Sequence, residues 1–437
     1  MREAVLVSSL LAVSTACAVR APSYRPRVSQ ALVERTGHGL APEAGGARIP
    51  PGISLADGLS EEEAVAIALW NNAAFQADLA RLGFARAELL EAGMLRNPAF
   101  SLLFPLGPKQ LEATGSLPLE AIWQRPRRIQ IARLDLEALS QSLVENGLNL
   151  VRDVKVAHTE LAAASERARL AAQDVGLRAE IAALAEARLR AGDIGEIEAM
   201  AARADREIAR EQAARLEREI DLARERLRSM LALPRTEDLT PTPRAAENAA
   251  PGEPAKLVET ALASRPDLRA AELAMEAARE RARLERWRYL PVGPVIDANG
   301  EGRRGIEAGP GVEVDIPVLQ RNQGGVRKAQ AAAERAGLEL EAARQRIALE
   351  VGVSHGQLRQ AAESLESWRA RILPSLEESM QAAAKAYAAG EVSYLFVLEA
   401  SRRLLEARLQ TIEAGAALRR ARAQLDRSVG TRIAGQP

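Results

Sequence analysis

Leu134-Asp-Leu-Glu-Ala-Leu-Ser-Gln-Ser-Leu-Val-Glu-Asn-Gly-Leu-Asn-Leu-Val151 is the stretch of sequence that decides the fold. Its apolar side chains recur at mixed spacings of three and four residues, which predicts a helix with one stripe buried against other helices. No proline occurs in residues 127–233, and residues 127–190 would extend about 95 Å as one helix at 1.5 Å per residue. A globular core does not need a helix of that length, so we predict coiled-coil packing.

The same pattern occurs twice in the chain. Residues 68–75 line up with residues 261–268 at an offset of 193, and residues 190–194 line up with residues 388–392 at an offset of 198. We therefore predict two structural repeats, each with a helix, two short extended segments, a very long helix, a glycine turn and a returning helix. The boundaries that we predict are a signal peptide (1–16), an extended segment (17–58), the first repeat (59–234), a Pro-rich linker (235–254), the second repeat (255–430) and a tail (431–437).

The composition favours helices and excludes one class of partner. Lys and Arg number 59, as do Asp and Glu, so the chain lacks the basic excess of a protein whose main partner is a nucleic acid or an anionic membrane surface. Aromatic residues make up only 3% of the chain, whereas Ala, Glu, Arg and Leu dominate, which is typical of long helices packed through small side chains. No apolar run reaches the ~18 to 20 residues of a membrane-spanning helix, so membrane insertion would have to use strands.

The N-terminus predicts export. Arg2 and the short apolar run of residues 4–13 are typical of a secretory signal peptide. The sole cysteine, Cys17, follows in Ser14-Thr-Ala-Cys17, which resembles the site at which bacterial lipoproteins are cleaved and acylated. The alternative is that Ala16-Cys17-Ala18 serves ordinary signal peptidase. A lipidated Cys17 would anchor the chain in outer-membrane lipid, where one acyl chain alone binds weakly.

Four short segments bounded by Pro and Gly predict strands, at residues 99–104, 111–119, 292–300 and 305–318. Only the last alternates cleanly, with Val312, Val314 and Ile316 on one face and Glu313 and Asp315 on the other, as expected for a strand between lipid and a lumen. Four strands cannot close a barrel, since the smallest outer-membrane barrels have about eight. Three chains that contribute four strands each would do so, which predicts a homotrimer.

Both long helical segments carry a helix breaker at the same distance from a glycine turn. Gly176 lies sixteen positions before Gly192, and Pro374 lies sixteen positions before Gly390. We therefore predict a bend or discontinuity about 24 Å from each hairpin tip, at 1.5 Å per residue. The alternative for Gly176 is a tolerated glycine in a helix interior.

Four motifs resemble the TolC-like outer-membrane efflux proteins. They are Leu59-Ser-Glu-Glu-Glu-Ala-Val-Ala-Ile-Ala-Leu-Trp-Asn-Asn72, Gly93-Met-Leu-Arg-Asn-Pro98, Ile316-Pro-Val-Leu-Gln-Arg-Asn-Gln-Gly324 and Tyr387-Ala-Ala-Gly-Glu-Val-Ser-Tyr-Leu-Phe-Val-Leu-Glu-Ala400. The resemblance implies a homotrimer with a twelve-stranded barrel in the outer membrane and a helical barrel across the periplasm. It also implies that the hairpin tips dock to a periplasmic adaptor and an inner-membrane pump, through Gly192, Asp193, Gly390 and Glu391. The Asn-Pro and Arg-Asn-Gln-Gly details are most similar to the heavy-metal cation efflux branch, in which lipidated members also occur.

The resemblance further implies a pore gate near the tips, where acidic side chains of three protomers form rings. Glu198 and Glu399 match acidic positions of that pattern, whereas Phe396 stands where TolC itself has an acid. Rings of three carboxylates would attract cations at short range. The alternative is that both glutamates are solvated charges on helix surfaces.

No motif predicts catalysis, a cofactor or a metal site. His38, His158 and His355 are far apart in the sequence, and neither a His/Cys cluster nor a phosphate-binding loop occurs. The leading hypothesis is a passive efflux channel of a tripartite system. The alternatives are a type I protein secretion conduit, a periplasmic coiled-coil scaffold or adaptor without a pore, and an exported enzyme.

Overall fold

The computed structural model describes residues 22–42, 49–104, 106, 111–242, 252–287, 292–300, 305–314 and 318–432. The predicted signal peptide, Cys17, Asp315, Ile316 and residues 243–251 of the Pro-rich linker lie outside the described residues. The described part is mainly helical with one small sheet, which confirms the predicted fold class. None of the helices in this part combines enough length with enough apolar residues to cross a membrane.

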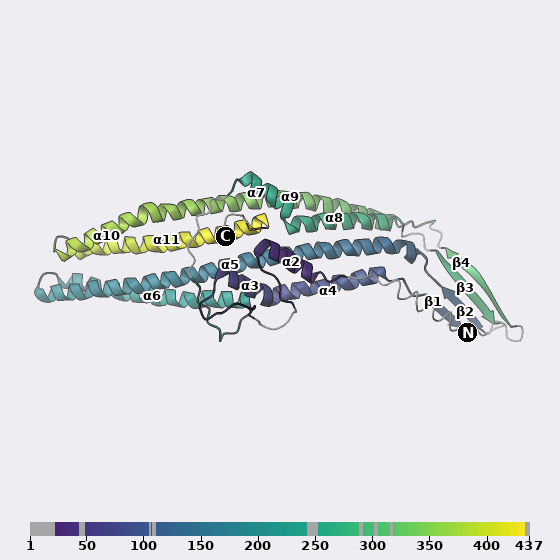
Figure 1. Ribbon diagram of the computed structural model, residues 1–437, viewed down its shortest axis with the longest axis horizontal. Coiled ribbons are helices and arrows are strands. Elements are labelled where there is room, and N and C mark those ends of the chain that lie inside the picture. The colour runs from purple at the N-terminus through teal and green to yellow at the C-terminus, as the bar shows by residue number, and fades with distance from the viewer. Residues whose placement is uncertain are drawn as a thin grey trace. The chain divides into compact units, whose positions relative to one another are not determined.

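The two halves of the chain have the same order of elements, except that a π-helical turn divides the long helix of the second half (Figure 1). After α2 (Arg25–Thr36), the first half has α3 (Glu61–Asn71), α4 (Ala73–Gly93), β1 (Ala99–Leu103), β2 (Leu111–Ser116), α5 (Glu120–Ala191) and α6 (Glu196–Leu231). The second half has α7 (Pro254–Ser264), α8 (Pro266–Glu285), β3 (Val292–Gly300), β4 (Ile306–Val314), α9 (Gln323–Glu366), the π-helix η2 (Ser367–Ile372), α10 (Leu373–Ala388) and α11 (Tyr394–Val429). Helices α3 and α7 each have 11 residues, and α6 and α11 each have 36.

The two short opening helices begin with different caps. At α3, Ser60 and Glu63 form a capping box, in which each side chain accepts the other residue's backbone N–H. At α7, Pro254 takes a first-turn position, where its missing N–H leaves no hydrogen bond unmade. Each opening helix then packs against the returning helix of its own half, α3 on α6 and α7 on α11.

The chain divides into two compact units that do not coincide with the two sequence repeats. Of the described residues, the first unit holds 22–28, 77–144 and 266–346, with the sheet. The second holds residues 29–76, 145–265 and 347–432, with both hairpin tips. Each unit therefore takes residues from both halves of the sequence. In the first unit, Leu134 of α5 packs with Leu273 and Ala277 of α8, and the Arg127 guanidinium lies 3.0 Å from the Glu280 carboxylate.

The sheet has the order β1-β2-β3-β4, and all neighbouring strands are antiparallel. The four observed strands lie within the four predicted segments, so the predicted strands are confirmed. Strand β2 ends at Ser116, shortly before Pro118, which has no N–H to donate to a neighbouring strand. Strands β1 and β4 form the edges of the sheet and are exposed along their whole length.

The structure contradicts the helix break predicted at Gly176. Helix α5 continues from Glu120 to Ala191 through this glycine, and a Cβ added there would meet no atom within 4 Å. A helix-interior glycine costs only about 1 kcal/mol relative to alanine, which a helix of 72 residues tolerates. Pro374 differs, because the π-helical turn η2 ends two residues before it and the Leu373 N–H bonds the Trp368 carbonyl five residues back. Proline cannot donate to the preceding turn, and the hydrogen-bond pattern changes at this place.

Candidate functional site

The two hairpin tips turn with the same backbone geometry. Gly192 follows α5 and Gly390 follows α10, with φ angles of 82° and 78°. The N–H groups of Asp193 and Glu391 each donate to a carbonyl five residues back, at 2.9 Å. This is a Schellman cap, which favours glycine because the left-handed conformation is strained for residues with a Cβ. All four turn residues are exposed.

Beneath the turns, the two hairpins share one apolar core. Its buried members come from all four helices: Ala182, Ala185, Ala202, Met380, Tyr387, Tyr394, Val397, Leu398 and Leu404. The rings of Tyr387 and Tyr394 lie 6.3 Å apart, and the Arg188 guanidinium of α5 lies 4.9 Å from the centre of the Tyr387 ring. These contacts tie α10 and α11 to α5 at the tips.

A set of hydrogen bonds that we name the tip latch joins α11 to α6. The Tyr394 hydroxyl donates to Asp205 Oδ2 at 3.1 Å, and Arg402 Nη2 donates to Asp205 Oδ1 at 2.8 Å. The Tyr394 N–H donates to Glu198 Oε1 at 3.1 Å, which satisfies a free donor in the first turn of α11. Tyr394 and Asp205 are buried, and burial together with the Asp205 charge raises the pKa of Tyr394. The phenol therefore stays protonated and donates.

The structure places the predicted gate residues in three different settings. Glu198 is half-buried and belongs to the tip latch. Glu399 is exposed and pairs with Arg403 one turn along the same helix, at 2.7 Å. Phe396 is exposed over 66% of its surface, next to the equally exposed Leu395.

Sequence reasoning did not find Asp205, Tyr387, Tyr394 or Arg402. A signal was present, because two of the four tyrosines in the whole chain stand seven residues apart at the second tip. In a chain so poor in aromatic residues, a tyrosine in a helix indicates a position where its hydroxyl forms a hydrogen bond. The partner Asp205 could not be found this way, because it resembles the many other acids of α6.

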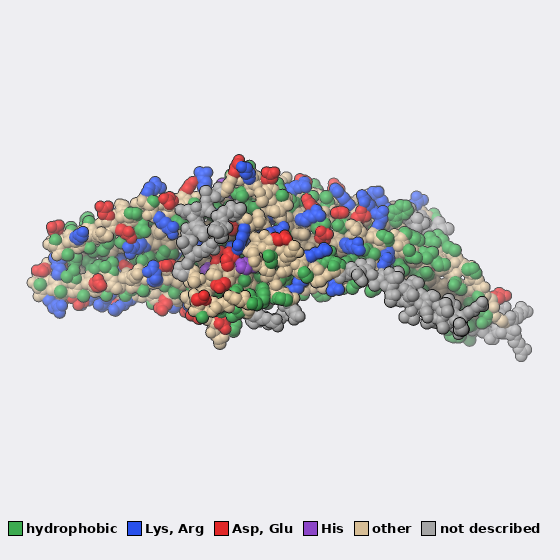
Figure 2. Space-filling view, viewed as in Figure 1, with side chains coloured by type: hydrophobic (Ala, Val, Ile, Leu, Met, Phe, Trp, Pro, Cys, Tyr) green, Lys and Arg blue, Asp and Glu red, His purple; other side chains and the backbone are tan. Residues whose placement is uncertain are grey.

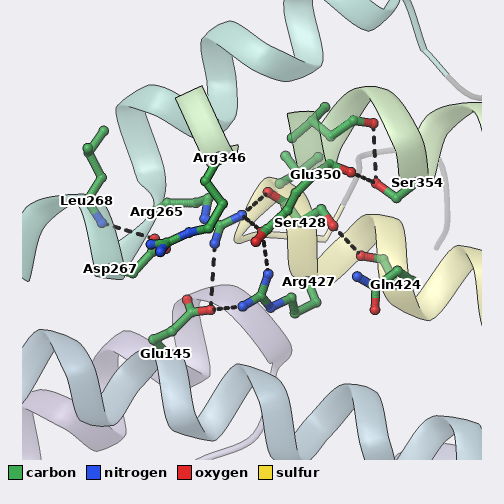
Figure 3. Close-up of polar contacts among 12 residues, drawn as sticks. Glu145, Arg265, Asp267, Leu268, Arg346, Glu350, Ser354, Gln424, Arg427 and Ser428 are labelled. Carbon is green, nitrogen blue, oxygen red and sulfur yellow. Dashed lines mark hydrogen bonds and ion pairs between the residues drawn. The ribbon is translucent and has the colours of Figure 1, made fainter. Parts of the chain in front are cut away.

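A second polar site in the same compact unit is a buried charge cluster of Arg265, Arg427, Glu145 and Glu350 (Figure 3). The Glu350 carboxylate lies 2.6 Å from both guanidinium groups, and the Glu145 carboxylate lies 2.7 Å from Arg427 and 3.8 Å from Arg265. Burial alone would raise the pKa of Glu350, but Arg265 and Arg427 bond the carboxylate and lower its pKa. The cluster joins α5, α9 and α11 with balanced charge.

The second half of the chain is similar to a known protein family. Residues 257–431, which hold the second hairpin and its tip, match the model of a family described as outer membrane efflux protein. This part of the chain is therefore similar to the outer membrane efflux proteins. The whole chain is 25% identical over 384 residues to the cobalt-zinc-cadmium resistance protein CzcC of Cupriavidus metallidurans, a match that covers 85% of the chain and 90% of CzcC.

The chain also has the fold of solved channel structures. The channel-forming protein CusC superposes with a TM-score of 0.73 at 18% identity, over 89% of this chain and 99% of CusC. The outer-membrane channel OprN gives 0.71 at 21% identity, over 85% of this chain and 90% of OprN. VceC of Vibrio cholerae gives 0.72 at 15% identity, over 85% of this chain and 96% of VceC.

The three histidines of the chain have backbone or carboxylate partners. His158 is buried, its Nε2 lies 2.8 Å from the Leu59 carbonyl, and burial lowers its pKa. His355 Nε2 lies 3.1 Å from the Gly252 carbonyl, and His38 Nε2 lies 2.8 Å from Glu62. Among the residues that the structure describes, no group of three His, Cys, Asp or Glu side chains could hold a metal ion.

Proposed function

We propose that this protein is the outer-membrane channel of a tripartite efflux system, a homotrimer that passively conducts solutes from an inner-membrane pump to the outside. The observation that carries the proposal is an antiparallel sheet with two open edges, attached to a pair of long helical hairpins. A channel of this kind performs no reaction, so we assign no catalytic residue.

The strand order supports assembly of three copies into one barrel. Strands β1 and β4 are edges that run in opposite directions, so β4 of one copy can pair antiparallel with β1 of the next. Unpaired edges are unfavourable, and a closed barrel removes them. Three copies of four strands give twelve, above the minimum of about eight for a closed outer-membrane barrel.

The substrates that we propose are heavy-metal cations. The support is the relative CzcC, which is a cobalt-zinc-cadmium resistance protein and aligns over 90% of its own length. We also propose that Cys17, which lies outside the described residues, is lipidated and anchors the protein in the outer membrane, from which it extends into the periplasm. Radiolabelled palmitate should then label the wild type and not Cys17→Ala.

The hairpin tips are our candidate for the gate and for the docking of the adaptor and pump. Both tips present exposed turns, at Gly192 with Asp193 and at Gly390 with Glu391. Phe396 and Leu395 add exposed apolar surface beside the second turn. The tip latch holds the two hairpins of one chain together, so its opening would let the second hairpin move away from the first.

A bilayer experiment tests the proposed function. The protein is purified from outer-membrane fractions and added to a planar lipid bilayer, where we expect discrete single-channel conductance steps from a heat-modifiable trimer. A protein that is absent from outer membranes, or that is inserted without conductance, would be a scaffold and would contradict the proposal. Growth of a deletion strain on cobalt, zinc, cadmium, dyes and antibiotics then tests the substrates: sensitivity confined to dyes and antibiotics contradicts metal export.

A further inference from the structure

One face of the sheet is apolar across all four strands. Residues that pair across strands share a face, and successive residues alternate between faces. In the observed register, the face that holds Phe100 of β1 and Ile306 of β4 carries no polar side chain in the four described strands. Both of these residues are exposed over 73% of their surface. A face of this composition fits lipid, so the helix ends next to the sheet would lie at a membrane surface.

The four helix ends next to the sheet belong to one compact unit and are joined to one another. In the first half, Arg125 Nε of α5 donates to the Gly93 carbonyl at the end of α4, at 2.6 Å. In the second half, Asn322 Nδ2, just before α9, donates to the Glu285 carbonyl at the end of α8, at 3.0 Å. An ion pair between α5 and α8 connects the two halves. The four ends therefore form one continuous band.

This band carries an excess of positive charge, and we name it the basic belt. It comprises residues 94–98, 119–128, 279–287 and 318–328, in which eleven Lys and Arg stand against three Asp and Glu. Figure 2 shows basic side chains gathered around the helix ends beside the sheet. The acids are outnumbered even where they pair, since Arg127 and Arg283 share Glu280, at 3.0 and 2.5 Å. The whole chain has 59 residues of each sign, and that balance hides the local excess.

The positive charge is densest where α4 and α5 meet. Arg128 Nη2 donates to the carbonyls of Met94 and Ala121, at 3.3 and 3.2 Å. These carbonyls are neutral, so they position the guanidinium group without cancelling its charge. Burial lowers the pKa of Arg128, and the nearby charges of Arg96 and Arg125 lower it further. Three guanidinium groups thus repel one another, and an anion that bridges them would relieve the repulsion.

Exposed tryptophan accompanies the charge in both halves of the chain. The chain has four tryptophans, and the two most exposed, Trp123 at 45% and Trp287 at 56%, both lie in the basic belt. Leu319, also in the belt, is exposed over 94% of its surface. Tryptophan is enriched at membrane–water interfaces, because its ring is apolar and its N–H is polar. A small soluble anion would account for the charge but not for these exposed apolar side chains, whereas a lipid headgroup and its acyl chain account for both.

We propose that the basic belt binds the phosphate groups of anionic phospholipids, in the membrane leaflet next to the helices. The proposal rests on the proposed trimeric channel and adds which lipids surround it. Guanidinium groups bind phosphate through paired, charge-assisted hydrogen bonds. Each basic residue near an anionic membrane surface strengthens binding on the order of fivefold, so the belt favours a headgroup with net negative charge over a zwitterionic one.

Tryptophan fluorescence tests this choice of lipid, because Trp123 and Trp287 lie in the belt. The full-length protein is reconstituted into vesicles that mix phosphatidylglycerol with phosphatidylcholine, one of which carries brominated acyl chains that quench tryptophan. Quenching as a function of the mixture gives the relative affinity of the protein for the two lipids. We expect the wild type to prefer phosphatidylglycerol by about fivefold or more. The preference should shrink in about 1 M salt, where the screening length falls to about 3 Å.

The variant Arg96→Gln/Arg125→Gln/Arg128→Gln removes the densest charge and keeps both tryptophans. Its preference for phosphatidylglycerol should fall on the order of threefold or more. The matched control Arg96→Lys/Arg125→Lys/Arg128→Lys keeps the charge, and its preference should stay within about twofold of the wild type. A wild type without preference, or an unchanged preference in the glutamine variant, overturns the proposal. An equal loss in both variants also overturns it, because packing and not charge would then select the lipid.

Conductance measured on the same preparations separates failure of the belt from failure of the proposed function. If the wild type gives no conductance but prefers phosphatidylglycerol, the proposed channel is wrong and the belt stands. If conducting protein shows no preference between the lipids, only the belt is wrong. If the glutamine variant does not assemble, Arg96→Gln is measured alone, because Arg96 is exposed. It should lower the preference by a smaller amount, and an unchanged preference overturns the proposal.

Discussion

Asn72 and Arg265 occupy the same position in the two halves of the chain, and each bonds the carbonyl of the penultimate residue of a returning helix. Asn72 Nδ2 donates to the Met230 carbonyl at 3.0 Å, and Arg265 Nη1 donates to the Ser428 carbonyl at 3.1 Å. The amide in the first half is neutral. The guanidinium in the second half extends further, to Glu350 and Glu145, and creates the buried charge cluster.

Replacing Arg265 with the residue of the first half should destabilise the protein strongly. Arg265→Asn removes one of the two guanidinium groups that contact Glu145 and Glu350. Removing one partner from a buried ion cluster costs about 3 to 5 kcal/mol, because charge is left uncompensated. Thermal unfolding followed by circular dichroism should show a lower midpoint for Arg265→Asn than for the wild type.

The double variant Arg265→Asn/Glu350→Gln provides the control. It restores the charge balance of the cluster, so it should recover on the order of 1 kcal/mol or more of the loss. An effect of Arg265→Asn that is small, or that Glu350→Gln does not reduce, would show that the cluster is not a coupled unit.

The helices and strands could be predicted because local signals agree with the final structure. Proline and glycine punctuate the four strands, and the apolar spacing of residues 134–151 fixes a helix that the structure extends to both sides. The break predicted at Gly176 is wrong because one interior glycine costs only about 1 kcal/mol, which is small for a helix of 72 residues.

The site could be predicted only in part, because its members meet through pairing and packing. The tip glycines stand out in the sequence, since they need a positive φ. The tip latch joins Asp205 to Tyr394 across 189 positions, and no local pattern indicates that distance. Likewise β1, β2 and β3 show no clean alternation by themselves, and the register that pairs Glu112 with Asn299 cannot be derived from either strand alone.

The folded protein should lose stability at acidic pH as the Glu62 carboxylate becomes protonated. Burial alone raises the pKa of this carboxyl, but His38, Lys155 and Arg432 face it and lower its pKa from 4.5 to about 2. The pKa is lower in the folded state, so the stabilisation is complete above about pH 4.5 and is lost as the pH falls toward 2. The shift corresponds to about 3 kcal/mol, which partial exposure of Glu62 reduces to about 1 to 2 kcal/mol.

The variant Glu62→Gln measures this contribution. Its unfolding midpoint should lie below that of the wild type at pH 7, and the two should converge as the pH is lowered to 2. A difference that stays constant from pH 7 to pH 2 would contradict a role for the ionised carboxylate.

Substituting alanine for three glycines should change the stability of the protein in opposite directions. Gly176→Ala should stabilise the protein by about 0.5 to 1 kcal/mol, because the helix continues through this position and a Cβ meets open space. Gly192→Ala and Gly390→Ala should each destabilise by about 1 kcal/mol, because their φ angles of 82° and 78° strain an alanine. Unfolding midpoints of the three variants check this, and a loss of stability in Gly176→Ala would restore a structural role for that glycine.

Tyr394→Phe should open the tips, because the tip latch depends on the hydrogen bond that the Tyr394 hydroxyl donates. Tyr387→Phe is the matched control, because the Tyr387 hydroxyl makes no hydrogen bond in the described part of the chain. Tyr394 donates to the buried Asp205, while the buried Tyr387 hydroxyl has no hydrogen-bond partner in the described part of the chain. Loss of the Tyr394 hydroxyl should cost about 1 to 2 kcal/mol and leave Asp205 held by Arg402 alone, whereas Tyr387→Phe should be neutral or slightly stabilising. In bilayers, Tyr394→Phe should spend more time in the conducting state than the wild type, and Tyr387→Phe should match it. Equal open times in all three proteins would mean that the latch fixes the hairpins without controlling the passage.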